Sequence, residues 1–214
     1  MQEIRVVLWD VGGVIQPDVR LPPQILGISP EEFDKLAATK EYRLYNKGLF
    51  GFEEMPPFTL SYLGREVTPA SSQQVKDAIL STWEPPRPDV VAIIRRIPGR
   101  FRKMILSTVP YDLEILVREA HENGLYRPEQ QYLQLFNEGD VLFSNRIHAT
   151  KAEKAAFAAV YDVCRIDPNY WLFIDDRPPN LRVAKEFGVG RTLLYTTTAE
   201  LEKELTQVGV LAGP

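Results

Sequence analysis

Cysteine and histidine are scarce in this sequence, which has one cysteine and two histidines among 214 residues. A single thiol forms no intramolecular disulfide, and so few sulfur and imidazole groups leave little for a zinc cluster or a serine–histidine triad. Cys164 lies in the helical pattern KAAFAAVYDVCRI, so we expect a packed core thiol in a reducing compartment.

Blocks of like charge and long apolar runs are also missing. The 25 basic and 29 acidic residues are spread along the chain and give a net charge of -4, which indicates neither a nucleic-acid nor a membrane-surface partner. No segment approaches the roughly 18 apolar residues of a membrane span, and MQEIRVVLWD lacks the cationic start and apolar stretch of a secretion signal. We expect a cytoplasmic protein that fills its own core.

Short apolar runs alternate with helical patterns over most of the chain. The runs IRVVLW, KMILS, YWLFI and RTLLY are typical of strands buried on both faces. Helical patterns span 112–123, 151–164, 181–187 and 199–208, and three of them stop at a glycine. We predict an α/β fold with a Rossmann-like parallel sheet flanked by helices.

One segment breaks the alternation. Between residues 16 and 86 there is no convincing strand, but SPEEF and SSQQ predict helix starts at Ser29 and Ser71, each three residues before a glutamate or glutamine. Turn-like punctuation such as QPDVRLPP and EPPRP separates these signals. We predict a helical cap domain over 16–86, inserted into a core formed by 1–15 and 87–214.

Polar side chains follow three of the predicted strands, at Asp10, Ser107 and the pair Asp175 and Asp176. Each has a plain structural explanation as a helix cap or an Asx turn, but parallel strands deliver all of them to the sheet edge where ligands bind. Carboxylates about 4 Å apart repel by roughly 1 kcal/mol in water and about 4 kcal/mol at a dielectric of 20. We therefore expect a cation there: Mg²⁺, which prefers oxygen ligands, and Lys151, otherwise a solvated surface charge.

The motifs LWDVGGV, ILST, Lys151 and FIDD resemble, in order and approximate spacing, the four motifs of the haloacid dehalogenase-like (HAD) superfamily. The segment NKGLFGFEEM is similar to the cap of its small sugar-phosphatase-like members. The resemblance implies that Asp10 is a nucleophile that forms an aspartyl-phosphate, and that Ser107 and Lys151 serve catalysis.

The same resemblance implies two sets of ligand contacts. Substrate would be held by Gly12, Gly13, Ser107, Thr108 and Lys151. Magnesium would be held by Asp10, the Gly12 carbonyl, Asp175 and Asp176, with the direct ligand of this last pair left open.

Two positions depart from the HAD pattern. Gly12 replaces a second aspartate that protonates the leaving group, a role typically worth about 10²–10⁴ in rate. Three explanations stay open: a leaving group that needs little protonation (an anomeric sugar oxygen, or an acyl or aryl phosphate), an acid from the cap or from His148, or vestigial hydrolysis. Thr108 replaces a frequent asparagine and still offers a hydroxyl.

The leading functional prediction is an Mg²⁺-dependent phosphatase for a small phosphorylated metabolite. The alternatives are a metal-free haloacid dehalogenase, which paired carboxylates disfavour, and a non-catalytic protein that binds a phosphate ligand or a partner. Arg20 or Arg43 is a guess for a second anionic group of the substrate. A homodimer formed through exposed apolar cap residues is also an open prediction.

Overall fold

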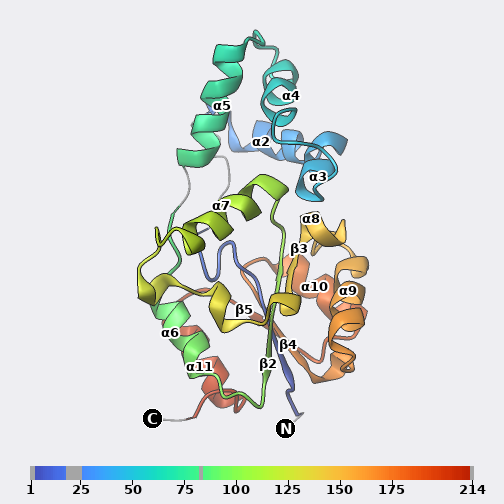
Figure 1. Ribbon diagram of the computed structural model, residues 1–214. Helices are drawn as coiled ribbons and strands as arrows, with labels where there is room; N and C mark the ends of the chain where they lie inside the picture. The colour runs from blue at the N-terminus through green and yellow to red at the C-terminus, as the bar shows by residue number, and fades with distance from the viewer. Residues whose placement is uncertain (1–2, 18–25, 82–83, 213–214) are drawn as a thin grey trace.

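The computed structural model describes residues 3–17, 26–81 and 84–212. Its core is a sheet of five parallel strands in the order β3-β2-β1-β4-β5 (Figure 1). These strands are β1 (Val6–Trp9), β2 (Arg102–Ser107), β3 (Val141–Phe143), β4 (Trp171–Asp175) and β5 (Arg191–Leu194). The predicted α/β fold with a parallel sheet is confirmed, and all five strands deliver their carboxyl ends to one edge.

Helices cover both faces of the sheet because alternate strand residues point to opposite sides. Val7, Trp9 and Ile105 belong to one apolar cluster, whereas Val6 and Leu8 belong to the other. The first cluster is shared with α6 (Pro88–Arg96), α7 (Tyr111–Glu122) and α11 (Thr198–Gln207), and the second with α9 (Lys154–Cys164) and α10 (Pro178–Phe187). Cys164 is buried there as a free thiol, as predicted.

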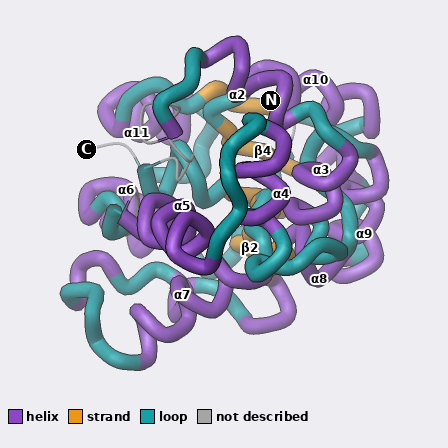
Figure 2. The backbone as a smooth tube through the Cα atoms, turned by 90° about the horizontal axis from the view of Figure 1, so that it is seen from above, coloured by secondary structure: helices purple, strands orange, loops and turns teal. Residues whose placement is uncertain are grey.

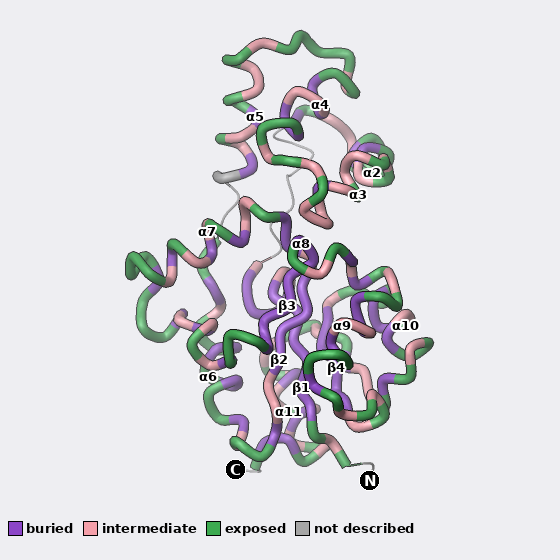
Figure 3. The backbone as a smooth tube through the Cα atoms, turned by 45° about the vertical axis from the view of Figure 1, so that its right-hand side comes forward, coloured by how far each residue is buried: buried purple, intermediate pink, exposed green. Residues whose placement is uncertain are grey.

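Four further helices lie beyond the carboxyl edge of the sheet, at the top of Figure 1. They are α2 (Pro30–Ala37), α3 (Lys40–Asn46), α4 (Met55–Tyr62) and α5 (Pro69–Ser81). They have an apolar cluster of their own that includes Phe33, Leu36 and Leu60. Seen from above, they lie over the strand ends (Figure 2), and more of their backbone is exposed than in the sheet (Figure 3). This group is the part of our predicted cap domain that the structure describes.

The base of the helical group is held together by contacts between its incoming and outgoing segments. The Arg87 backbone N–H donates to the Ile15 carbonyl at 2.8 Å, and its guanidinium donates to the Val14 carbonyl at 2.9 Å. The Gln16 side-chain amide donates to the Glu84 carbonyl at 2.6 Å. These contacts define the neck, where the chain leaves the sheet and returns to it.

Of the local predictions, one is confirmed, one is wrong, and one strand was missed. The helix start at Ser29 is confirmed, with a full capping box to Glu32, but the predicted start at Ser71 is wrong. Helix α5 begins at Pro69, and the Thr68 hydroxyl accepts from the Ser71 N–H at 3.1 Å. Strand β3 has three residues, too few to show a periodicity, and was not predicted.

Short helical segments complete the connections between the longer elements. A single-turn helix, α8 (Ser144–Ile147), follows β3 directly. Four 3-10 turns connect longer elements: η1 (Pro128–Gln130), η2 (Leu133–Leu135), η3 (Glu138–Asp140) and η4 (Pro168–Tyr170). Among the helices of the described ranges, none combines the length and the apolar character needed to cross a membrane.

Candidate active site

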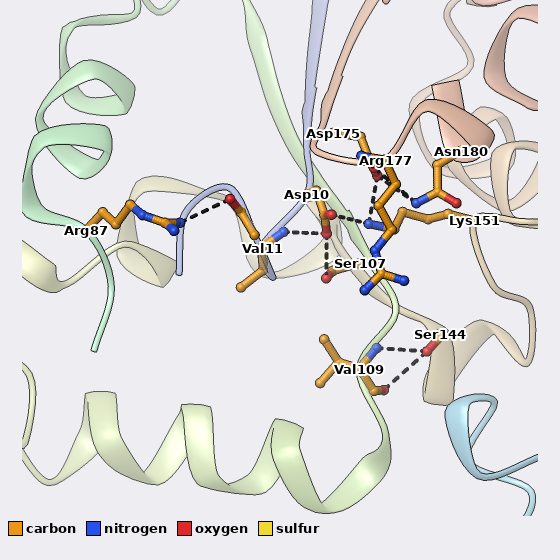
Figure 4. Close-up of polar contacts among 11 residues, drawn as sticks. Asp10, Val11, Arg87, Ser107, Val109, Ser144, Lys151, Asp175, Arg177 and Asn180 are labelled. Carbon is orange, nitrogen blue, oxygen red and sulfur yellow. Dashed lines mark hydrogen bonds and ion pairs between the residues drawn. The ribbon is translucent and has the colours of Figure 1, made fainter. Parts of the chain in front are cut away.

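Asp10 is the first residue beyond β1 and is almost fully buried, with 2% of its surface exposed. Its backbone N–H donates to the Ile174 carbonyl of β4 at 3.0 Å, which fixes the end of the strand. Its Oδ1 accepts from the Val11 N–H at 2.7 Å and from the Ser107 hydroxyl at 2.9 Å (Figure 4). The carboxylate of one strand is therefore oriented by the last residue of its neighbour, β2.

Lys151 lies between two of the carboxylates, buried beneath the sheet edge. Its ammonium pairs with Asp10 Oδ2 and, at 2.8 Å, with Asp175 Oδ2. We predicted Lys151 at the start of a helix, but α9 begins at Lys154. The Glu153 carboxylate accepts from the Thr150 N–H at 3.0 Å, which holds the preceding residues in a turn and aims Lys151 at the site.

Asp175 is the last residue of β4, and both of its oxygens accept contacts from the protein. Oδ1 accepts from the Arg177 N–H at 2.8 Å and from the Asn180 amide at 3.0 Å. Oδ2 accepts from Asn180 at 3.1 Å and pairs with Lys151. Asp175 is thus an anchor for the lysine, held from beneath by the first turn of α10.

Asp176 packs against the glycine turn that follows β1. A Cβ added to Gly13 would lie 2.4 Å from Asp176 Cγ, and Gly13 has φ of +84°. A side chain at this position would collide with the carboxylate and would also be strained in the left-handed region. The absence of a side chain at Gly13 therefore lets Asp176 approach the same edge as Asp10.

The electrostatic balance of this cluster is negative. Asp10, Asp175 and Asp176 each offer a carboxylate oxygen within 4.8 Å of the others. Burial raises the pKa of Asp10 to about 7; the nearby Asp175 charge adds to this effect, and Lys151 opposes it. Burial alone would lower the pKa of Lys151, but the two carboxylates raise it above its usual value. One ammonium faces three carboxyl groups, so the donor set suits a hard divalent ion such as Mg²⁺.

A cavity of about 460 Å³ opens from this cluster toward the helical group. On the sheet side it is lined by Asp10, Gly12, Ser107, Thr108 and Lys151. The structure therefore brings these five predicted site residues to one cavity. Gly13, Asp175 and Asp176 contribute from behind, through the turn and the contacts described above.

Some predicted candidates lie elsewhere, and other residues were missed. His148 is exposed, and its Nδ1 contacts the Lys47 carbonyl at 2.9 Å; Arg43 lines the cavity, and Arg20 lies outside the described residues. Arg177 and Asn180 also line the cavity, with Arg177 extending beside Lys151 (Figure 4). The sequence analysis assigned a role to the two aspartates of their segment, DDRPPN, but none to Arg177 or Asn180. A polar residue one helical turn beyond the aspartates was the available signal.

A larger hollow, of about 640 Å³, lies at the opposite end of the strands from this cavity. It is lined by basic residues at the amino ends of the strands and holds none of the predicted site residues. Two of these bases are already paired, Arg5 with Glu3 and Arg102 with Asp140. The cavity at the carboxyl edge is therefore the candidate active site.

Comparison with known proteins identifies the fold. No family model matches the chain, and no curated protein matches it in sequence. It is similar to a predicted HAD-like family hydrolase from Porphyromonas gingivalis, at 21% identity, 96% coverage of this chain, 97% of the other and a TM-score of 0.74. The predicted resemblance to the HAD superfamily is confirmed at the level of the fold.

Two other solved structures with this fold differ in what they bind. A HAD family enzyme from Bacteroides thetaiotaomicron, in complex with magnesium and inorganic phosphate, matches at 22% identity, 90% and 94% coverage and a TM-score of 0.64. L-2-haloacid dehalogenase from Xanthobacter autotrophicus, with chloropropionic acid covalently bound, matches at 18% identity, 98% and 85% coverage and a TM-score of 0.58.

Proposed function

We propose that this protein is an Mg²⁺-dependent phosphatase of the HAD type that hydrolyses a small phosphorylated metabolite through an aspartyl-phosphate on Asp10. One observation carries the proposal: a buried carboxylate, an ammonium and a hydroxyl line one cavity together, and two further carboxylates lie directly behind them. The HAD-like fold of the magnesium- and phosphate-bound enzyme described above supports it.

The reaction proceeds in two displacements on phosphorus. The Asp10 oxygen attacks phosphorus, the bond to the leaving oxygen breaks, and the electron pair departs with that oxygen. Water then attacks the same phosphorus and breaks the bond to Asp10, which releases inorganic phosphate. The single Ser107 hydroxyl proton is donated to Asp10 in the free protein and would turn to a phosphoryl oxygen when substrate binds. Lys151 stabilises the negative charge that is shared during transfer.

Magnesium binding divides the paired aspartates by role. Lys151, Arg177 and Asn180 hold Asp175 as the anchor of the lysine, whereas Asp176 lies against the Gly13 turn that follows Asp10. Asp176 is therefore our proposed direct ligand, together with Asp10 and the Gly12 carbonyl. When bound there, Mg²⁺ would neutralise repulsion between an anionic nucleophile and an anionic substrate.

A metal-free dehalogenase is the second candidate, because a dehalogenase shares the fold. The clustering of Asp10, Asp175 and Asp176 within 4.8 Å argues against it, since a metal-free attack on carbon in a haloacid has no use for three adjacent carboxylates. A non-catalytic phosphate-binding protein is the third, because Gly12 offers no acid. The cap at 16–86, the cytoplasmic location and a homodimer remain predictions.

The deciding experiment is a phosphate-release screen over sugar, nucleotide and aryl phosphates, with and without Mg²⁺. We expect release that requires Mg²⁺, disappears in Asp10→Asn and persists in Asp162→Asn, which neutralises an exposed carboxylate. Acid-quenched enzyme should contain a phosphorylated peptide that includes Asp10. Chloride release from a haloacid without metal would establish the dehalogenase, and ligand-induced thermal stabilisation without turnover would establish the binding protein.

A further inference from the structure

The wall of the cavity opposite the catalytic cluster is mainly apolar. Its apolar residues are Phe33, Tyr42 and Tyr45 from α2 and α3, Met55 from α4, Ile79 from α5, and Leu113 from α7. Four of these side chains are less than a tenth exposed: Phe33 at 8%, Tyr45 at 6%, Met55 at 3% and Ile79 at 8%. Asp34, Arg43, Asn46 and Thr59 of the same helices also line the cavity, so a polyhydroxylated substrate would find partners there but would leave its hydroxyls unpaired along the apolar part of the wall.

The aromatic residues form a connected surface. Phe33 and Tyr42 meet edge to face with ring centroids 6.0 Å apart, and Tyr42 and Tyr45 follow at 6.3 Å. Rings arranged in this way offer faces and edges to another ring placed between them. Burial raises the pKa of the Tyr45 phenol, so it stays neutral and remains part of this wall.

The described lining of the same cavity has neither of the usual acids beside the nucleophile: position 12 is glycine, and no histidine lines the cavity. Apart from Asp10, two carboxylates line it, Asp34 and Glu153. Glu153 accepts from Lys47 at 2.6 Å and from the Thr150 N–H at 3.0 Å. Burial would raise the pKa of Glu153, yet these contacts lower it, so it carries no proton near neutrality. Asp34 lines the cavity from α2, on the side of the helical group, and is exposed to solvent.

These two features point to one kind of substrate, and the inference rests on the phosphatase function proposed above. We propose that the substrate is a phosphate ester of an acidic hydroxyl on an aromatic ring, an aryl phosphate, with the ring against the wall of α2–α5. A phenolic oxygen leaves as a stable anion and takes its proton from water afterwards, so it needs no acid at position 12. The ring fills the apolar wall, which a sugar does not.

The kinetic consequence follows from the two displacements. Aryl phosphates should form the aspartyl-phosphate quickly, and its hydrolysis, which also lacks an assisting base at position 12, should limit turnover. We expect a burst of phenol release followed by a common kcat for different aryl phosphates, because they share one phosphorylated intermediate. In contrast, kcat/KM should rise as the phenol becomes more acidic.

Four probes separate the ring from the leaving group. Phenyl phosphate has both features, benzyl phosphate has the ring on a poor leaving group, acetyl phosphate has a good leaving group without a ring, and glucose 1-phosphate has a polar body. We expect kcat/KM for phenyl phosphate to exceed each of the others by about tenfold or more.

Variants test the wall itself. Met55→Gln should lower kcat/KM about tenfold more for phenyl phosphate than for acetyl phosphate, through KM. A cooperative thermal unfolding transition shows that the variant is folded. Leu63→Gln makes the same kind of change in the apolar cluster of the cap, away from the cavity lining, and should leave the phenyl-to-acetyl ratio unchanged.

The outcomes separate this inference from the proposed function. Faster hydrolysis of glucose 1-phosphate than of phenyl phosphate would overturn the aryl assignment while leaving the phosphatase intact. Equal kcat/KM for benzyl and phenyl phosphate would show that the site does supply an acid, and would also overturn it. Release of phosphate from none of the four probes, with Mg²⁺ present, would refute the phosphatase function itself.

Discussion

Replacing Lys151 by methionine removes the cation that pairs with both buried carboxylates. Methionine is unbranched like lysine and only one heavy atom shorter, but it leaves Asp10 and Asp175 without their shared partner. Removing one partner of a buried ion pair typically costs about 3–5 kcal/mol. For a chain of this size each kcal/mol shifts the melting temperature by roughly 2–4 °C, so we expect Lys151→Met to melt about 10 °C lower in the absence of metal.

The pH dependence of this loss has a defined sign. The pKa of Asp10 is raised mainly by burial, so the folded protein binds a proton more tightly than the unfolded chain, and stability falls as pH rises toward 7. Without Lys151 the pKa of Asp10 rises further, because the opposing charge is gone. The difference between wild type and variant should therefore be large at pH 8 and should shrink toward pH 5.

Magnesium should recover part of the loss, because it replaces the missing positive charge. The assay is thermal unfolding of both proteins at pH 5 and pH 8, with EDTA or with Mg²⁺. Lys154→Met, three residues along and exposed, is the matched control and should change stability by less than about 0.5 kcal/mol. Equal stability of Lys151→Met and wild type at pH 8 without metal would refute the buried cation and the electrostatic reasoning with it.

Three further substitutions test other parts of the structure. Gly13→Ala should cost about 1–3 kcal/mol in urea unfolding and weaken Mg²⁺ binding, because its methyl group displaces Asp176; unchanged Mg²⁺ affinity would contradict this packing. Gly12→Asp should restore an acid and raise kcat/KM for benzyl phosphate relative to phenyl phosphate by about tenfold or more, and an unchanged ratio would count against the missing-acid explanation. Glu114→Gln should destabilise by about 2–3 kcal/mol at pH 7, because it weakens contacts to two arginines at 2.7 and 2.5 Å. Although burial would raise the pKa of Glu114, these arginines lower it, so the difference in stability between wild type and variant should disappear in acid. A difference that does not change with pH would argue against the ion pairs.

The sequence was most informative where one physical rule dominates. Fully buried strands read as continuous apolar runs, so β1 and β4 and the aspartates that end them were predictable. The sequence also predicted that these aspartates meet at one edge of the sheet, because parallel strands all end on the same side. The close approach of Asp176 to Gly13 was not predictable, because it depends on the path of a turn rather than on a periodic pattern.

The cavity wall was beyond the reach of sequence patterns. Tyr42 and Met55 are ordinary apolar positions of short helices, and nothing in their spacing distinguishes the residues facing the cavity from those facing the cap cluster. That choice depends on how α2–α5 sit over the sheet, which is a matter of tertiary packing. The carboxylates at the sheet edge called for a cation, and Lys151 was the candidate; its catalytic role came from the resemblance. The turn made by Thr150 and Glu153 differs from the predicted helix start because the following alanines continue the helical pattern.

The neck has a consequence for how this architecture changes over time. Because Arg87 is tied to Ile15 and Val14, and Gln16 to Glu84, the long excursion starts and finishes at nearly the same point in space. The contacts at the neck offset the entropic cost of closing that loop, and this cost increases only slowly with the number of residues in the loop. Evolution can therefore exchange, shorten or enlarge the excursion as a module, and acquire new selectivity without rebuilding the reactive centre beneath it.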